Sequence, residues 1–262
     1  MIILKLGGSV ITFKNKSNTA NFKAIKRLAK EIATGYNNKK LILIHGGGSF
    51  GHVTANQYKL HEGLKHKSQL IGIALTQRAM QELNGYIINS LISYNVPVIP
   101  IQPSAFTITS KGRIKKMDTI VIKRLLKKGI VPVLYGDVVQ DITQGCAILS
   151  GDQLVSYLAL KFNAKRVILG TDVNGIYTAD PKINPEAELI KEITPITYKA
   201  ILEKIGKSTQ TDVTGGMLNK IKELITLCKK NIESEIVNAS KPNIIKRTLL
   251  GEKGLGTIIH GD

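Results

Sequence analysis

The sequence contains no tryptophan and only two cysteines, Cys146 and Cys228. They lie far apart and in no CxxC or Cys/His arrangement, so the sequence indicates neither a disulfide framework nor a zinc site. Cysteine usage of this kind is typical of a reducing compartment. We therefore expect a cytoplasmic protein.

Long apolar runs are also absent. No stretch approaches the roughly 20 residues that a membrane span requires, and the richest segment, residues 86–103, is interrupted by polar residues and a proline. The amino-terminal segment MIILKLGGSVITFK lacks a basic region before its apolar start, and Lys5 and two glycines break it. This pattern predicts a strand rather than a signal peptide, so we expect a soluble protein without a membrane partner.

Acidic residues are scarce, with 19 against 37 lysines and arginines, which gives a formal net charge of +18. Such a charge favours anionic partners and makes nucleic acid a candidate. The lysines are dispersed, however, and few aromatic residues lie between them to stack on bases. We therefore expect a generally basic surface and no specific nucleic-acid partner.

Short runs rich in isoleucine and valine alternate with longer segments of helical period. This alternation predicts the α/β class, as a three-layer αβα sandwich around a mainly parallel open sheet. Two further segments, 106–114 and 137–148, have alternating residues around turn glycines and predict β-hairpins that project from the sheet. Strands of the sheet are expected at residues 2–6, 41–44, 96–101, 130–134, 166–169 and 235–237.

Two common phosphate motifs, GxxxxGK[ST] and GxGxxG, are missing. Glycines nevertheless follow two predicted strands, in KLGGS at residues 5–9 and in HGGGSFGH at residues 45–52. Gly7 and Gly8 alone would be explained equally well by a simple turn. Because α/β sheets bind ligands at the carboxyl ends of their strands, the two loops together predict an anion site in one crevice.

Three more segments form one pattern with the two glycine loops. Gly151-Asp152 opens a predicted helix, GTDVNGIYTADP at residues 170–181 follows a strand, and DVTGGM at residues 212–217 leads into a helix that contains Lys220. These five elements, in this order and spacing, resemble the amino-acid-kinase superfamily, which includes acetylglutamate, aspartate, carbamate and uridylate kinases. The resemblance spans almost the whole chain.

Within this superfamily, KLGGSVIT and GSFGH resemble isopentenyl phosphate kinases of the archaeal type. The discriminating residue is His52, because isopentenyl phosphate and fosfomycin kinases have a histidine there and carboxylate kinases generally lack it. The chain departs from the pattern at Phe13, where the family often has a polar residue, and at Gln153, where it often has a second acidic residue.

The resemblance implies ATP-dependent conversion of isopentenyl phosphate to isopentenyl diphosphate, in a modified mevalonate route of isoprenoid biosynthesis. It also implies ATP with Mg²⁺, no protein metal ligand and a homodimer. Residues 1–262 would form a single domain, with an acceptor-binding lobe at about 1–165 and a nucleotide-binding lobe at about 166–262. Two alternatives stay open: a kinase for fosfomycin or another small phosphate or phosphonate, and a non-catalytic relative that binds nucleotides or nucleic acid.

Phosphoryl transfer requires neutralisation of negative charge on three oxygens, for which lysines are well suited. By resemblance, Lys5 would bridge donor and transferred phosphate, Lys14 would stabilise the transferred group, and Lys220 would hold the donor's terminal phosphates. Asp152 would keep these lysines charged and oriented, although a carboxylate at a helix start is also explained as an N-cap. His52 would donate a hydrogen bond to the acceptor's phosphate, whose charge favours a protonated imidazole.

An apolar tail needs an apolar wall, which Ile71, Ile73, Leu75 and Met80 on a helix that faces Ile142 and Ile148 could supply, although aliphatic residues at helical spacing are core residues more often than pocket linings. The remaining expected contacts come from the resemblance. ATP is expected to contact Lys5, Gly7, Gly8, Ser9, Gly48, Asp172, Val173, Tyr177, Gly216 and Lys220. The acceptor is expected to contact Gly47, Gly51, His52 and Gly151.

Overall fold

The first strand of the chain, β1, lies near the centre of the main sheet. In the computed structural model, which describes residues 1–13, 15–179, 181, 183–207 and 215–261, its strand order is β12-β14-β13-β9-β1-β2-β6-β3. Neighbouring strands are parallel except for β13 and β14. The strands are β1 (Ile2–Leu6), β2 (Leu41–His45), β3 (Val98–Pro100), β6 (Val131–Tyr135), β9 (Arg166–Thr171), β12 (Glu192–Ile193), β13 (Glu233–Asn238) and β14 (Thr257–Ile259).

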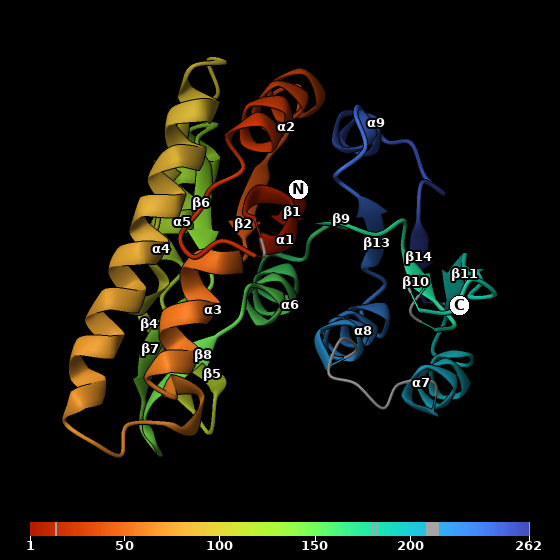
Figure 1. Cartoon of the computed structure of the whole chain (residues 1–262). Coiled ribbons are helices and arrows are strands. Elements are labelled where there is room, and N and C mark those ends of the chain that lie inside the picture. Colours follow the sequence, from red (N-terminus) through yellow and green to blue (C-terminus); the bar gives the residue numbers. More distant parts are fainter. Residues whose placement is uncertain (14, 180, 182, 208–214, 262) are drawn as a thin grey trace.

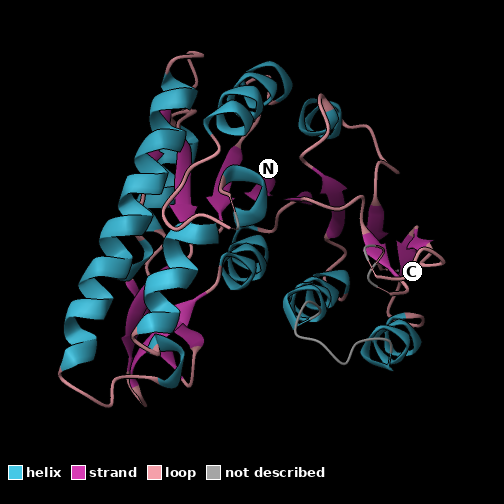
Figure 2. Ribbon diagram, viewed as in Figure 1, coloured by secondary structure: helices cyan, strands magenta, loops and turns pink. Residues whose placement is uncertain are grey.

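Helices cover both faces of this sheet (Figures 1 and 2). Alternate residues of β1 belong to different hydrophobic clusters: Leu4 and Leu6 pack with α2, α4 and α9, whereas Ile3 packs with α5, α6 and α8. The predicted three-layer αβα sandwich is therefore confirmed. The helices are α1 (Gly8–Ile11), α2 (Phe22–Gly35), α3 (Gly48–Gln57), α4 (Ser68–Ile92), α5 (Ile120–Lys127), α6 (Gly151–Phe162), α7 (Tyr198–Lys207), α8 (Gly215–Cys228) and α9 (Ile244–Leu250).

The two predicted hairpins are present, and they pair with each other in a second sheet of order β5-β4-β7-β8. Its strands are β4 (Thr107–Ser110), β5 (Arg113–Met117), β7 (Asp137–Asp141) and β8 (Gly145–Leu149). The carboxylate of Asp141 joins the hairpins, because it accepts hydrogen bonds from the Gly112 and Thr143 N–H groups, both at 2.8 Å. Burial alone would raise the pKa of Asp141, but these hydrogen bonds lower it to about 2.

Smaller elements complete the chain: the 3₁₀ turns η1 (Leu60–Glu62) and η2 (Pro103–Ala105) and the strand pair β10 (Ile176–Tyr177) and β11 (Leu189–Ile190). The cysteines Cys146 and Cys228 lie in different hydrophobic clusters and do not pair with each other. Among the described residues, no helix is both long enough and apolar enough to span a bilayer.

The topology places a crevice beside β1. The chain proceeds from β1 to β2 on one side, and β9 later pairs with β1 on its other side. Ligands of open α/β sheets bind at such a switch point, outside the carboxyl ends of the strands. The loops after β1, β2 and β9 all lie at this edge.

Candidate active site

The two glycine loops after β1 and β2 are in direct contact. A Cβ added to Gly8 would lie 2.2 Å from the backbone nitrogen of Gly48. Gly48 has a φ of +50°, and its Cβ would lie 2.1 Å from Oγ1 of Thr12. Gly8 and Gly48 are therefore required by the packing of one loop on the other, in addition to any role in binding an anion.

This packing brings several helix starts to one cavity of about 1200 Å³. Helices α1, α3, α6 and α8 all begin beside it, and the positive ends of helix dipoles favour bound anions. The cavity is lined by nearly all the residues predicted to bind ATP or the acceptor: Lys5, Gly7, Gly8, Ser9, Gly47, Gly48, Gly51, His52, Gly151, Asp152, Asp172, Val173, Tyr177 and Lys220.

Gly216 and Lys14 were also predicted to lie in the site. Gly216 lies in the first turn of α8, next to Met217, which lines the cavity. Lys14 lies outside the described residues, so its predicted role stays a prediction.

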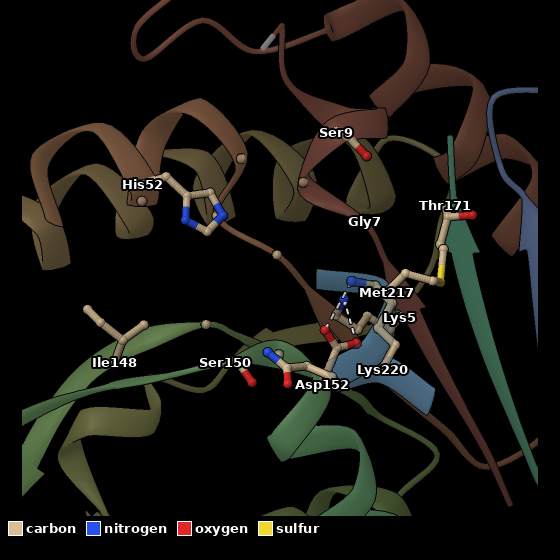
Figure 3. A pocket seen from close by; sticks show the side chains of 18 of the residues that line it. Lys5, Gly7, Ser9, His52, Ile148, Ser150, Asp152, Thr171, Met217 and Lys220 are labelled. Atoms are coloured by element: carbon tan, nitrogen blue, oxygen red, sulfur yellow. Dashed lines mark ion pairs between the residues drawn. The ribbon is translucent and has the colours of Figure 1, made fainter. Parts of the chain in front are cut away.

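A lysine-aspartate-lysine cluster, formed by Lys5, Asp152 and Lys220, lines the cavity (Figure 3). Lys5 alternates with Leu4 and Leu6 along β1, so its side chain points toward α6, which carries Asp152. The ammonium of Lys5 is 3.0 Å from Oδ1 of Asp152, and that of Lys220 is 3.3 Å from Oδ2. Gly151 leaves room for this contact, because a Cβ there would lie 2.9 Å from Cε of Lys5.

The cluster combines two cations with one anion in a site that is largely shielded from solvent. Lys5 is only 5% exposed. Burial and the charge of Lys220 lower its pKa, and the pairing with Asp152 only partly offsets them. Burial would raise the pKa of Asp152, but the two lysines hold it below its usual value, so the carboxylate stays ionised. The excess positive charge is suited to an anionic ligand.

Asp152 is not the N-cap of α6, contrary to the alternative drawn from the sequence. Ser150 is the cap, and its hydroxyl accepts a hydrogen bond from the Gln153 N–H at 3.1 Å. The carboxylate of Asp152 is thus available to pair with both lysines. Gln153, where the family often has an acidic residue, instead bonds the hairpin through the Ile114 N–H at 2.7 Å.

His52 lies in α3 on the wall of the cavity, and its ring points into it (Figure 3). Reduced hydration within the cavity lowers the pKa of His52, and the charges of Lys220 and Lys5 lower it further. The sequence-based expectation of a protonated imidazole applies to the ring beside a bound phosphate, so it stays a prediction. An anion placed between the ring and the lysines would oppose this shift.

His45 differs from His52 although it opens the same loop. It is completely buried at the end of β2, where Nδ1 donates to the Gly46 carbonyl at 3.1 Å and Nε2 lies 3.2 Å from Oδ1 of Asn84. Burial lowers the pKa of His45 to about 4. This neutral imidazole is part of the sheet's core, as its position after an apolar strand predicts.

The two sides of the cavity differ in their lining (Figure 3). His52 and Ile148 lie on one side, Thr171 and Met217 lie on the other, and the lysine-aspartate cluster lies between them. Ser9 connects the first glycine loop to the loop after β9, because its hydroxyl donates to Oδ1 of Asp172 at 2.8 Å.

The apolar wall suggested by the sequence is mostly wrong. Ile71, Leu75 and Ile142 are 54%, 44% and 59% exposed, and only Met80 and Ile148 of that set line the cavity. The helical spacing was identified correctly, but spacing alone does not tell which face of α4 points inward.

Three other lining residues were not selected from the sequence: Asp137, Arg113 and Glu223. Asp137 is buried and accepts a hydrogen bond from the Ser104 N–H at 3.0 Å, and burial raises its pKa. Its position just after β6, at the carboxyl edge of the sheet, is the signal that would have identified it. Arg113 and Glu223 carry no comparable local signal.

Protein ligands for a metal are not evident in the part of the chain that the structure describes. No group of three or more His, Cys, Asp or Glu side chains there is arranged to hold an ion. Both oxygens of Asp152 contact lysines, and Asp172 accepts a hydrogen bond from Ser9. These carboxylates do not form the paired oxygen ligands that Mg²⁺ prefers.

The sequence as a whole matches known kinases. A profile of the amino acid kinase family matches residues 1–238. The isopentenyl phosphate kinase of Methanothermobacter thermautotrophicus is 42% identical over 100% of this chain and 99% of its own length. That of Methanocaldococcus jannaschii is 38% identical over 96% of each chain. A solved isopentenyl phosphate kinase structure superposes with a TM-score of 0.85, at 40% identity over 99% of both chains. The chain therefore belongs to the amino acid kinase family and, within it, to the isopentenyl phosphate kinases.

Proposed function

We propose that this protein transfers the γ-phosphoryl group of ATP to isopentenyl phosphate and so forms isopentenyl diphosphate and ADP. The observation that carries the proposal is the cluster of Lys5, Asp152 and Lys220 in the same cavity as His52. The relatives that match along nearly their full length are named for this substrate. The product would enter isoprenoid biosynthesis.

The proposed reaction needs no general base. An ionised oxygen of the acceptor's phosphate attacks the γ-phosphorus, a new P–O bond forms, and the bond from the γ-phosphorus to the β,γ-bridging oxygen breaks to release ADP. Lys5 and Lys220 neutralise negative charge on the transferred group, and Asp152 keeps their two ammonium groups close together. Their shielding from water strengthens this electrostatic effect.

His52 is proposed to bind the acceptor. A phosphate monoester carries about 1.5 to 2 negative charges at neutral pH. Burial, Lys220 and Lys5 lower the pKa of His52, and such a charge beside the imidazole would oppose the effect of the two lysines. The acceptor would therefore promote protonation of the histidine that holds it, and the charged ring would donate a strong hydrogen bond.

We propose that ATP occupies the side of the cavity formed by the loop after β9 and the start of α8. Asp172, Val173 and Tyr177 line that side, and Lys220 would contact the terminal phosphates. Mg²⁺ would be bound mainly by phosphate oxygens and water, where it neutralises charge. An acceptor lobe at residues 1–165 and a nucleotide lobe at 166–262 fit this division, although both lobes share the main sheet.

Release of ADP from a panel of acceptors tests the proposal. The panel contains isopentenyl phosphate, dimethylallyl phosphate, geranyl phosphate, fosfomycin, N-acetylglutamate and uridine monophosphate. Isopentenyl phosphate should give the highest kcat/KM. A higher value for fosfomycin would support the phosphonate alternative, and a preference for N-acetylglutamate would contradict the role of His52.

Two further parts of the proposal rest on the resemblance. We propose a homodimer, which sedimentation equilibrium of the purified protein would test. We also propose a cytoplasmic location, which fits two buried cysteines that lie in separate clusters. Fractionation of source cells would test it.

A further inference from the structure

Helices α6 and α8 are joined by two successive polar contacts. Asp152 and Ser156 lie four residues apart on one face of α6, and Lys220 and Glu223 lie three residues apart on one face of α8. The first contact is the ion pair of Asp152 with Lys220 at 3.3 Å. The second is a hydrogen bond at 2.5 Å, in which the Ser156 hydroxyl donates to Oε2 of Glu223.

The second contact is well shielded from water. Ser156 is 4% exposed, and the side chain of Glu223 is 14% exposed. A hydrogen bond to an ionised carboxylate is stronger than one between neutral groups, and loss of one partner from a buried bond is costly. The Ser156–Glu223 bond therefore restricts how α8 can rotate or shift against α6.

Glu223 also binds the edge of the hairpin sheet. Both terminal nitrogens of Arg113 on β5 donate to its carboxylate, with Nη2 at 3.2 Å from Oε2. The side chain of Arg113 is 64% exposed, so this ion pair alone contributes little. It nevertheless connects α8 to a second element beside the cavity.

The start of α6 is fixed to the same hairpin by Gln153. Its Oε1 accepts from the Ile114 N–H at 2.7 Å, and its Nε2 donates to the Gly112 carbonyl at 3.0 Å. The hairpin, α6 and α8 are thus joined pairwise around Asp152. Each of the three connections lies within one or two turns of the lysine-aspartate cluster.

We propose that Glu223 is a positioning residue, which fixes α8 so that the ammonium of Lys220 stays beside Asp152. This inference rests on the proposed function, in which Lys220 neutralises charge on the transferred phosphoryl group. The flexible side chain of Lys220 does not by itself fix the position of its ammonium, so that position also depends on where α8 holds the backbone. A displacement of about 1 Å in a catalytic group can reduce the rate about 10²-fold.

The test compares Glu223→Ala, Glu223→Gln and Ser156→Ala with wild type, using isopentenyl phosphate and ATP with Mg²⁺. Glu223→Ala should lower kcat about tenfold or more, with KM for isopentenyl phosphate changed less than about twofold. Glu223→Gln keeps an oxygen that can accept from Ser156, so it should restore most of the lost kcat. Ser156→Ala should give a smaller loss of the same kind.

The decisive arm is a double-mutant cycle with Lys220→Ala. If Glu223 acts through Lys220, Glu223→Ala should lower kcat in wild type but have almost no further effect in the Lys220→Ala background. A merely structural role, or direct contact with a substrate, would reduce activity in both backgrounds. Equal fold-losses in the two backgrounds would overturn the proposal, as would wild-type kcat in Glu223→Ala.

Matched controls separate this result from other failures. Glu82→Ala removes a glutamate on α4 that also accepts a hydrogen bond, from Tyr86 at 2.5 Å, and it should leave kcat unchanged. Circular dichroism shows whether each variant is folded; if Glu223→Ala is not, Ser156→Ala takes its place in the cycle. If wild type does not phosphorylate isopentenyl phosphate, the proposed function fails, and the same cycle is then measured with the best acceptor of the panel.

Discussion

The ammonium of Lys5 lies 3.0 Å from Oδ1 of Asp152, although Lys5 belongs to the central strand of the main sheet and Asp152 to a helix packed on it. Strand alternation points Lys5 toward that helix, and the missing side chain of Gly151 leaves space for it. The position of this cation is therefore determined by the packing of the sheet and its helix.

Lys220→Ala should lower kcat by about 10²-fold or more, because it removes a charge that acts mainly in the transition state. Its melting temperature should stay close to that of wild type, since Asp152 keeps Lys5 as a partner. Lys229→Ala, at an exposed position just after α8, is the control and should retain full activity. Wild-type kcat with only a raised KM for ATP would show that Lys220 acts in ground-state binding.

Gly8→Ala should destabilise the protein by about 1–3 kcal/mol, because its Cβ would overlap the Gly48 backbone at 2.2 Å. Gly85→Ala is the matched control. Gly85 lies within α4 with nothing within 4 Å of its added Cβ, so this change should stabilise the protein by about 0.5–1 kcal/mol. Urea denaturation measures both. A neutral effect of Gly8→Ala would mean that the two loops do not pack as described.

Stability should depend on pH through His45. Its pKa is depressed to about 4 in the folded protein, so the unfolded chain binds the proton more readily. Neutral His45 makes its full contribution to the free energy of unfolding above the usual histidine pKa near 6.5. As the pH drops from there toward 4, this contribution decreases by up to about 3 kcal/mol. Urea denaturation between pH 4 and 7 should show this decline in wild type and a flatter profile in His45→Gln. Identical slopes would contradict the assignment of a neutral, buried His45.

The fold was predictable wherever hydrophobic pattern and burial agree. Residues 2–6 form β1 as predicted, because the strand is buried from Ile3 to Leu6 and all its residues except Lys5 are apolar. Strands β12 and β14 were missed, since two or three residues at the edge of a sheet are too short to show a period. The pairing of the two hairpins through β4 and β7 depends on contacts distant in sequence.

Residues of the site that belong to sequence motifs were predictable, and residues that only the fold brings there were not. The residues of the glycine loops, Asp152 and Lys220 were selected from motifs and resemblance, and the structure places them around one cavity. Glu223 and Arg113 were not, because their contact joins a helix and a hairpin more than a hundred residues apart. The protonation of His52 beside the acceptor stays a prediction, because it depends on the bound phosphate and on the charges of Lys220 and Lys5, which only the folded arrangement brings near.

The most direct test of the account is the kinetic effect of His52→Ala, measured separately for isopentenyl phosphate and for ATP. If His52 binds the acceptor's phosphate, kcat/KM for isopentenyl phosphate should fall about 10- to 100-fold, the loss expected for one charge-assisted hydrogen bond, while KM for ATP stays near wild type. His52→Gln should recover part of the loss, and His66→Ala, at an exposed histidine outside the cavity lining, should have no effect. Unchanged acceptor kinetics in His52→Ala would contradict the account and return carboxylate acceptors to consideration.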